Sequence, residues 1–242
     1  MIEVVKPQWQ APAGIHACCS TRLGGVSQAP YQQLNLGLHV GDRADDVMRN
    51  RQQLRQTLAL PGEPGWINQT HSARVVTLEQ DDSRDADAAI TRQPGSVAVV
   101  MTADCLPILL CNHAASEVAA IHAGWRGLQR GIIQATIAAM QSSPQQLMAW
   151  IGPGISQPCY EVGAEVHAAF VDAVVDAESC FQPSRPEHWL CDLGGLAASV
   201  LNESGISDVT RSPHCSFRDD RLFYSYRREA VTGRMASLIW IN

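Results

Sequence analysis

The stretch from Val97 to Cys111 is apolar except at Thr102, Asp104 and Pro107. It is shorter than the roughly 18 apolar residues that a membrane-spanning helix needs, so we expect it inside a folded protein. The segment "SVAVVMTAD", from Ser96 to Asp104, overlaps the start of this stretch and has apolar residues at both odd and even positions. A strand with that pattern is buried on both faces, which predicts a central position in a sheet.

Further apolar segments predict the rest of the architecture. Strands are expected at residues 15–20, 73–78, 105–111, 117–123, 147–152 and 235–241, and helices at 42–60, 126–141, 163–174 and 192–204. Asp45 or Asp46 is the expected N-cap of the first helix. Because strands and helices do not alternate strictly, we expect an α/β (α+β-like) protein with layered mixed sheets, not a doubly wound parallel sheet. No linker rich in Gly, Ser or Pro divides the chain, which predicts a single domain over residues 1–242.

The charge distribution narrows the class of partner. The net charge is -6, and the chain has neither a basic tail nor a lysine and arginine stripe. Nucleic acid and membrane surfaces are therefore not expected as partners. The expected partner is a small-molecule substrate. The N-terminus lacks the charged-then-apolar layout of a signal peptide, so we expect a cytoplasmic protein. We expect it to be a monomer or a weak homo-oligomer.

The eight cysteines are scattered and form no CxxC pair. In a reducing compartment this arrangement predicts free thiols, most of them buried, with one or two at most taking part in chemistry.

Cys105 and His122 are the two reactive side chains in a pair of neighbouring apolar strands. If residues 112–115 form the connecting loop, Cys111 lies opposite Ser116 and Cys105 lies opposite His122. Directly opposed side chains share a face, with Cβ atoms roughly 4.5–5.5 Å apart, which suits a shared metal ion or a thiol–imidazole pair. A slip of one residue would place the two groups on opposite faces. The alternative is that Cys105 is a small core residue and His122 a hydrogen-bonded core histidine.

Polar residues near this pair add candidates for a site. Asp104 directly precedes Cys105, and "AGWRG" brings Arg126 to the start of a helix, where backbone N–H groups and a guanidinium can hold an anion. His71, in "NQTHSARVV", would complete a set of three N and S ligands with one open position, typical of catalytic zinc. Its alternative is a histidine in a surface turn. Arg22, before a Gly-Gly turn, is a further candidate for phosphate binding, with a plain surface arginine as the alternative.

Eight segments in order resemble the motifs of a known family. They are "STRLGGVS", "LNLGLHVGD", "NQTHSARVV", "MTADCLPILL", "AAIHAGWRG", "WIGPGIS", "YEVG" and "FYSYRRE…TGRMASLIW". The family is the YfiH family, also called the laccase-domain or multicopper polyphenol oxidoreductase family, and the resemblance runs from about residue 15 to the C-terminus. One segment departs from it: Ser216 and Phe217 follow Cys215 where the family often has Cys-Thr-Tyr. That departure puts a substrate contact from this loop in doubt.

The resemblance implies a fold and a metal site. The fold is a mixed α/β sandwich of layers, similar to the catalytic domain of cytotoxic necrotizing factor. The metal ligands carry over onto His71, Cys105 and His122, and the implied ion is zinc. Copper is disfavoured, because multicopper oxidases use paired His-x-His motifs and this sequence contains none.

The resemblance also implies the activity. Family members are described as purine nucleoside phosphorylases that cleave adenosine, inosine and methylthioadenosine with phosphate and also deaminate adenosine. On this reading Cys105, His122 and Asp104 are the catalytic residues, with Asp104 as proton carrier or orienting group. The expected substrate or phosphate contacts are Arg22, Gln69, Ser72 and Arg126. The alternatives are a cysteine-type hydrolase that removes misincorporated serine from a muramyl precursor of peptidoglycan, a copper-dependent polyphenol oxidase, and a binding module without turnover.

Overall fold

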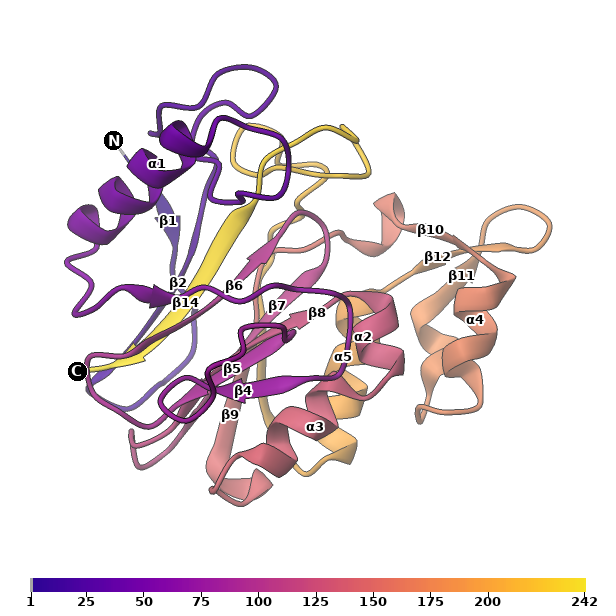
Figure 1. Ribbon diagram of the computed structural model, residues 1–242. Helices are drawn as coiled ribbons and strands as arrows, with labels where there is room; N and C mark the ends of the chain where they lie inside the picture. The colour runs from indigo at the N-terminus through magenta and orange to yellow at the C-terminus, as the bar shows by residue number, and fades with distance from the viewer. Residues whose placement is uncertain (1) are drawn as a thin grey trace.

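The structure is a computed structural model that describes residues 2–242. Two mixed sheets pack face to face, and helices cover their outer faces (Figure 1). The predicted α/β class with layered mixed sheets is confirmed. Among the described residues, no helix is both long and apolar enough to cross a membrane.

The first sheet has five strands in the order β1-β2-β14-β6-β3, antiparallel except for the β3–β6 pair. Their bounds are β1 Val4–Val5, β2 Ile15–Ser20, β3 Pro64–Gly65, β6 Val97–Thr102 and β14 Met235–Ile241. The expected central strand is therefore β6, which lies between two neighbours. The closing strand β14, far away in the sequence, occupies the middle of this sheet.

The second sheet has six strands in the order β13-β9-β7-β8-β5-β4. Their bounds are β4 Val75–Thr77, β5 Ala88–Thr91, β7 Leu106–Asn112, β8 Val118–Ala123, β9 Leu147–Ile151 and β13 Asp208–Arg211. The β4–β5 and β9–β13 pairs are parallel and the others antiparallel. A separate three-stranded sheet of β10 Glu161–Gly163, β11 Phe181–Pro183 and β12 His188–Cys191 lies to the right in Figure 1.

Alternate residues of the central strands enter different parts of the core, as the two-residue period of a strand requires. In β7, Leu109 packs between the sheets, whereas Ile108 and Leu110 pack under the helices on the far side. In β6, Val100 packs between the sheets, whereas Val99 packs on the outer face. Both faces of each sheet are covered, which explains the unbroken apolar runs in the sequence.

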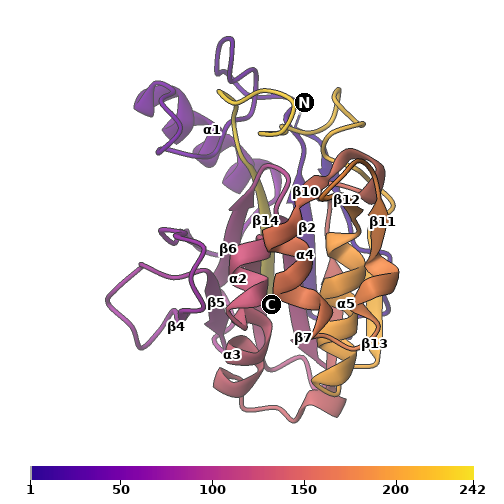
Figure 2. The same cartoon turned by 90° about the vertical axis from the view of Figure 1, so that its right-hand side faces the viewer.

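Five α-helices cover the sheets. Their bounds are α1 Ala44–Thr57, α2 Trp125–Gln129, α3 Ile132–Ala139, α4 Ala164–Val171 and α5 Leu193–Glu203. Helix α1 lies against the first sheet, and α2, α3 and α5 lie on the second (Figures 1 and 2). The amphipathic pattern of α1 is responsible for its placement, since Val47 and Leu54 are fully buried on one side of it.

Two details of the predicted helices are wrong. The single helix expected at 126–141 is two helices, because Gly131 adopts a left-handed conformation with φ +81° that interrupts the backbone ladder. Helix α1 begins after Arg43, and neither Asp45 nor Asp46 caps it, because the N-cap residue is Arg43 and no side chain supplies the cap bond. Both carboxylates still lie in the first turn, where the helix dipole favours negative charge.

The hairpin of β7 and β8 exists, but its predicted register is shifted by two residues. Leu106 pairs with Ala123, and Pro107 pairs with His122. Cys111 pairs with Val118 instead of Ser116 because β8 begins only at Val118, and the Asn112 side chain accepts bonds from the N–H groups of the loop residues Ser116 and Glu117. A shift of two residues preserves the face of every side chain, whereas a shift of one would exchange the faces. The face that the prediction assigned to His122 is therefore unchanged.

The eight cysteines are all free thiols, and six of them are buried. This confirms the prediction of free, mostly buried cysteines. Cys105 and Cys159 are the two that are partly exposed.

Candidate functional site

His71, Cys105 and His122 converge at one end of the two packed sheets. The candidate ligand atoms of these three residues all lie within 4.8 Å of one another. His122 is the next-to-last residue of β8, and it shares with Ala120 the face that looks toward the first sheet. Cys105 lies in the turn between β6 and β7, and His71 lies in the loop before β4. Three segments distant in sequence thus meet where the strands end.

The donor set fits a metal ion. His71 Nε2 and Cys105 Sγ are 3.8 Å apart. Two ligands of a tetrahedral zinc ion, with Zn–S about 2.3 Å and Zn–N about 2.0–2.1 Å, would be about 3.6 Å apart. Two imidazoles and a thiolate are also the N and S donors that zinc prefers, and three protein ligands leave one position open. The described residues therefore contain a His-Cys-His cluster that can hold a metal ion.

Asp87 organises two of the three ligands. Its carboxylate accepts a hydrogen bond from Nδ1 of His122 at 2.8 Å, which leaves Nε2 of that ring free to face the other ligands. The same carboxylate accepts three successive backbone N–H groups, those of Thr70, His71 and Ser72, and the Ser72 hydroxyl as well. Such a run of N–H groups forms a concave nest for an anion. Asp87 is fully buried, so one carboxylate fixes both the His122 ring and the His71 loop.

The His71 loop and the Cys105 turn both use left-handed backbone. His71 has φ +58° and Asp104 has φ +89°. Non-glycine residues adopt this conformation only where the surroundings hold it. The Asp87 bonds hold His71, and the Arg130 guanidinium donates to the His71 carbonyl at 2.7 Å. The His71 backbone is therefore held through both its N–H group and its carbonyl.

The electrostatics favour a thiolate facing an imidazolium. Burial raises the pKa of Cys105, but the neighbouring His122 and His71 rings lower it to about 6. Burial lowers the pKa of His122, but the Cys105 and Asp87 charges raise it to about 9. Burial raises the pKa of the Asp87 carboxyl, yet the bonds from His122 and Ser72 bring it well below its usual range. The thiolate form that binds metals is thus available at neutral pH.

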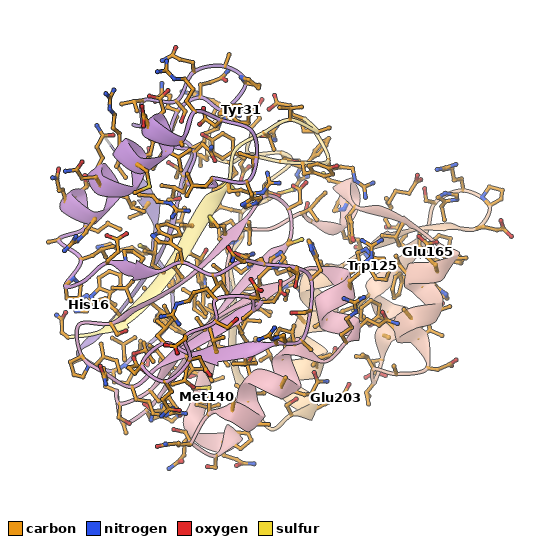
Figure 3. The ribbon with its side chains drawn as sticks, in the orientation of Figure 1. His16, Tyr31, Trp125, Met140, Glu165 and Glu203 are labelled. Carbon is orange, nitrogen blue, oxygen red and sulfur yellow. The ribbon has the colours of Figure 1, made fainter. Side chains whose placement is uncertain are left out.

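Gly124 leaves room for the ligands. A Cβ atom at this position would lie 2.8 Å from Cys105 Sγ and 2.9 Å from His71 Cδ2. Both are closer than real Cβ atoms approach other heavy atoms, so the close approach of the chain to the ligands requires glycine here. The adjacent Trp125, which starts α2, is labelled in Figure 3.

A cavity of about 450 Å³ opens onto the three ligands. It is lined by His39, Gln69, His71, Met101, Thr102, Ala103, Cys105, His122, Arg126, Tyr226 and Arg234. Two of the residues expected to contact substrate, Gln69 and Arg126, are among them. The Gln69 amide is already occupied by the backbone of Met101, donating to its carbonyl and accepting from its N–H, both at 2.7 Å.

The other expected site residues, Ser72, Asp104 and Arg22, do not line this cavity. Ser72 donates its hydroxyl to Asp87. Asp104 accepts from the Ser216 hydroxyl and from the Arg227 backbone N–H, each at 2.7 Å. Arg22 donates to the carbonyls of Gln32 and Asp220, and its guanidinium lies 4.7 Å from the centre of the Tyr224 ring.

Sequence reasoning missed Asp87, His39, Tyr226 and Arg234. Asp87 carried a usable signal, because it directly precedes the buried residues Ala88–Ile90, and a buried carboxylate needs partners. His39 and Arg234 lie inside quoted segments, "LNLGLHVGD" and "TGRMASLIW", but nothing in those segments shows that they face one cavity.

Known proteins resemble this chain over nearly its whole length. Residues 16–242 match the family described as "Multi-copper polyphenol oxidoreductase laccase". A protein of Escherichia coli (strain K12) named "Purine nucleoside phosphorylase YfiH" is 43% identical over the full length of both chains. "Purine nucleoside phosphorylase PA4543" of Pseudomonas aeruginosa is 44% identical over 98% of this chain and 97% of its own.

Solved structures share the whole fold. The crystal structure of the Neisseria meningitidis protein NMB0706 has a TM-score of 0.94 and 44% identity, covering 99% of each chain. That of YlmD from Geobacillus stearothermophilus has a TM-score of 0.88 and 31% identity, covering 95% of this chain and 93% of that one. The predicted resemblance is confirmed, and the chain belongs to the YfiH family, also known as the laccase-domain family.

Proposed function

We propose that this chain is a zinc-dependent purine nucleoside phosphorylase acting on adenosine, inosine and methylthioadenosine. The observation that carries the proposal is the cavity that opens directly onto His71, Cys105 and His122. Relatives of matching full length bear the name purine nucleoside phosphorylase, which supports the choice of substrate. Zinc is favoured over copper because the site offers one set of two imidazoles and one thiolate.

The residues of the chain prepare the reaction. In phosphorolysis the glycosidic C–N bond breaks, a phosphate oxygen bonds to the ribose carbon, and the base leaves with a proton. His71, Cys105 and His122 would hold the zinc ion, which would supply Lewis-acid polarisation of a substrate oxygen. Asp87 keeps the His122 ring oriented with Nε2 toward the cavity. Both carboxylate oxygens of Asp104 are bound by the C-terminal segment, which favours its orienting role for the Cys105 turn.

The test is an assay with and without phosphate. Purified protein of measured metal content is incubated with inosine, and ribose-1-phosphate is quantified. We expect ribose-1-phosphate only when phosphate is present. Release of free ribose in the absence of phosphate would contradict phosphorolysis.

We also propose adenosine deamination at the same metal centre. Conversion of adenosine to inosine, followed by absorbance, should occur without phosphate and should stop when a chelator removes the metal. Deamination that survives complete metal removal would contradict the assignment.

A second candidate function is cysteine-type hydrolysis, such as removal of serine from a muramyl precursor. It is favoured by the Cys105 thiolate, which lies 3.8 Å from His71 Nε2 and beside the Asp87–His122 pair. The two candidates respond in opposite ways to reagents. A chelator should inactivate the phosphorylase, whereas a cysteine hydrolase should be blocked by iodoacetamide and relieved by metal removal.

The eight free thiols are typical of a reducing compartment, which supports a cytoplasmic location. We further propose a single domain that is a monomer or a weak homo-oligomer. Size-exclusion chromatography with light scattering would test the oligomeric state.

A further inference from the structure

The cavity beside the metal ligands has cationic walls. Its lining includes Arg126 and Arg234, and none of the described lining residues is Asp or Glu. A pocket with arginines and no carboxylate attracts anions, and arginine is suited to oxyanions because its planar fork can donate two parallel bonds.

Arg234 is held in place by hydrogen bonds to the Asn35 side chain and to two neighbouring backbone carbonyls, and not by a carboxylate. Its N–H donates to Asn35 Oδ1 at 3.0 Å, and its Nη1 donates to the carbonyls of Thr232 and Gly233. No carboxylate in the described part of the chain lies within salt-bridge distance of its guanidinium. The side chain is thus fixed in position without a salt bridge to a carboxylate.

The segment at Gly37 makes room for the Arg234 side chain. A Cβ at Gly37 would lie 2.9 Å from Arg234 Cγ and 3.3 Å from its Cβ. The side-chain oxygen of Asn35 accepts hydrogen bonds from the backbone N–H groups of Gly37 and Arg234, so one side chain aligns these two segments of the chain. The aliphatic part of Arg234 is therefore packed, which lowers the entropy lost when its guanidinium binds a ligand.

Arg126 is the second residue of α2 and also lines the cavity. Its guanidinium lies 4.5 Å from the centre of the Trp125 ring, which orients the side chain without consuming its N–H donors. Arg126 is exposed and, within residues 2–242, has no carboxylate partner. Arg22 differs, because it does not line this cavity.

We propose that Arg234 and Arg126 together form the oxyanion subsite that receives orthophosphate next to His71, Cys105 and His122. The inference rests on the proposed phosphorolysis for the identity of the anion. The same fork would also accept the phosphate group of a nucleotide, so the test separates the two sources.

The experiment measures binding apart from turnover. Metal-loaded protein is titrated with sodium phosphate by calorimetry in the absence of nucleoside, and in a parallel arm with adenosine monophosphate. The variants are Arg234→Gln, Arg234→Lys and Arg126→Gln, and Arg49→Gln on the exposed surface of α1 is the control for net charge. Metal content and circular dichroism are recorded for each.

We expect Arg234→Gln and Arg126→Gln each to weaken phosphate binding by about tenfold or more, the loss typical of a hydrogen bond to a charged group. Arg234→Lys should lose less phosphate affinity, since lysine keeps the positive charge but not the planar fork of N–H donors. Arg49→Gln should bind phosphate as the unaltered protein does. The metal content should be the same in all of them.

Phosphate affinity unchanged in both glutamine variants would overturn the subsite, as would absence of phosphate binding to the unaltered protein. Weakened binding of adenosine monophosphate with unchanged binding of orthophosphate would overturn the assignment to orthophosphate. If Arg234→Gln does not fold, Arg126→Gln and Arg234→Lys decide the question. Failure of the phosphorolysis proposal is distinct: phosphate binding would depend on both arginines while no ribose-1-phosphate forms from any nucleoside.

Discussion

The carboxylate of Asp87 lies 2.8 Å from Nδ1 of His122, and the backbone of Asp87 also accepts the His122 N–H at 2.7 Å. The two residues face each other because Asp87 directly precedes β5, whose Ala88 pairs with Ile121 of β8. The same carboxylate holds the loop of His71. Strand pairing thus determines the orientation of two of the three candidate metal ligands.

Replacing Asp87 by Asn should weaken metal binding. The neutral amide cannot stabilise the oriented His122 ring as a carboxylate does, and losses of such partners typically cost about 10–100-fold in metal affinity. The measurement is zinc affinity by competition with a chromogenic chelator. Asp45→Asn, an exposed change of the same kind on α1, is the control. Equal zinc affinity in the two variants would contradict the role of Asp87.

Cys105→Ala should remove metal binding and nucleoside cleavage together, because the thiolate is one of three ligands. Cys159→Ala makes the same substitution at the other partly exposed cysteine and should leave both properties unchanged. Metal content by mass spectrometry and inosine phosphorolysis are measured on the same samples. Phosphorolysis retained by a metal-free Cys105→Ala protein would rule out the metal mechanism.

Alkylation of Cys105 in the metal-free protein should remain fast to unusually low pH. The pKa of this thiol is lowered from 9.0 to about 6, because the His122 and His71 rings outweigh the effect of burial. The thiolate is the reactive form, so the rate with iodoacetamide should be maximal above pH 6 and fall as the pH drops through about 6. Cys105→Ala should lack this rapid phase. A midpoint near 9 would show that the rings do not stabilise the thiolate.

Gly124→Ala should damage the metal centre with little effect on folding. The Gly124 φ of -72° suits alanine, but its Cβ would lie 2.8 Å from Cys105 Sγ, so the ligand must move. We expect zinc affinity to fall by about tenfold or more, since ligand geometry sets affinity. Gly127→Ala is the matched control three residues later, where the nearest atom to the added Cβ is 3.4 Å away. Similar zinc affinity in both variants would contradict the steric argument.

The sequence was most informative where periodicity is strong. The strand Ile15–Ser20 and the closing strand Met235–Ile241 have the predicted bounds, because buried strands leave apolar runs that end at turn residues. The predicted pairing of Cys105 with His122 is wrong by two residues in register. A shift of two residues keeps each side chain on its face of the sheet, so the two residues still lie in one site. Gly131 was overlooked inside a helical pattern, since apolar spacing continues across the break.

What the sequence did not reveal depends on contacts between distant segments. Arg234 reaches the cavity because strand β14 lies beside β6, whose end carries Thr102. Arg22 precedes a Gly-Gly turn as a phosphate-binding residue can, but only the fold shows that carbonyls of Gln32 and Asp220 occupy its donors. Hydrogen-bond partners of this kind leave no local pattern.

The nest of N–H groups around Asp87 has a consequence for how metal ions can be added to the protein and removed from it. Hydrogen bonds to one buried carboxylate hold the His71 backbone and the His122 ring. Small zinc domains, by contrast, unfold when the metal leaves. We expect the polypeptide to keep its fold when the ion is removed, because these hydrogen bonds do not involve it, so ions of different elements can be exchanged in one folded preparation and compared directly for activity.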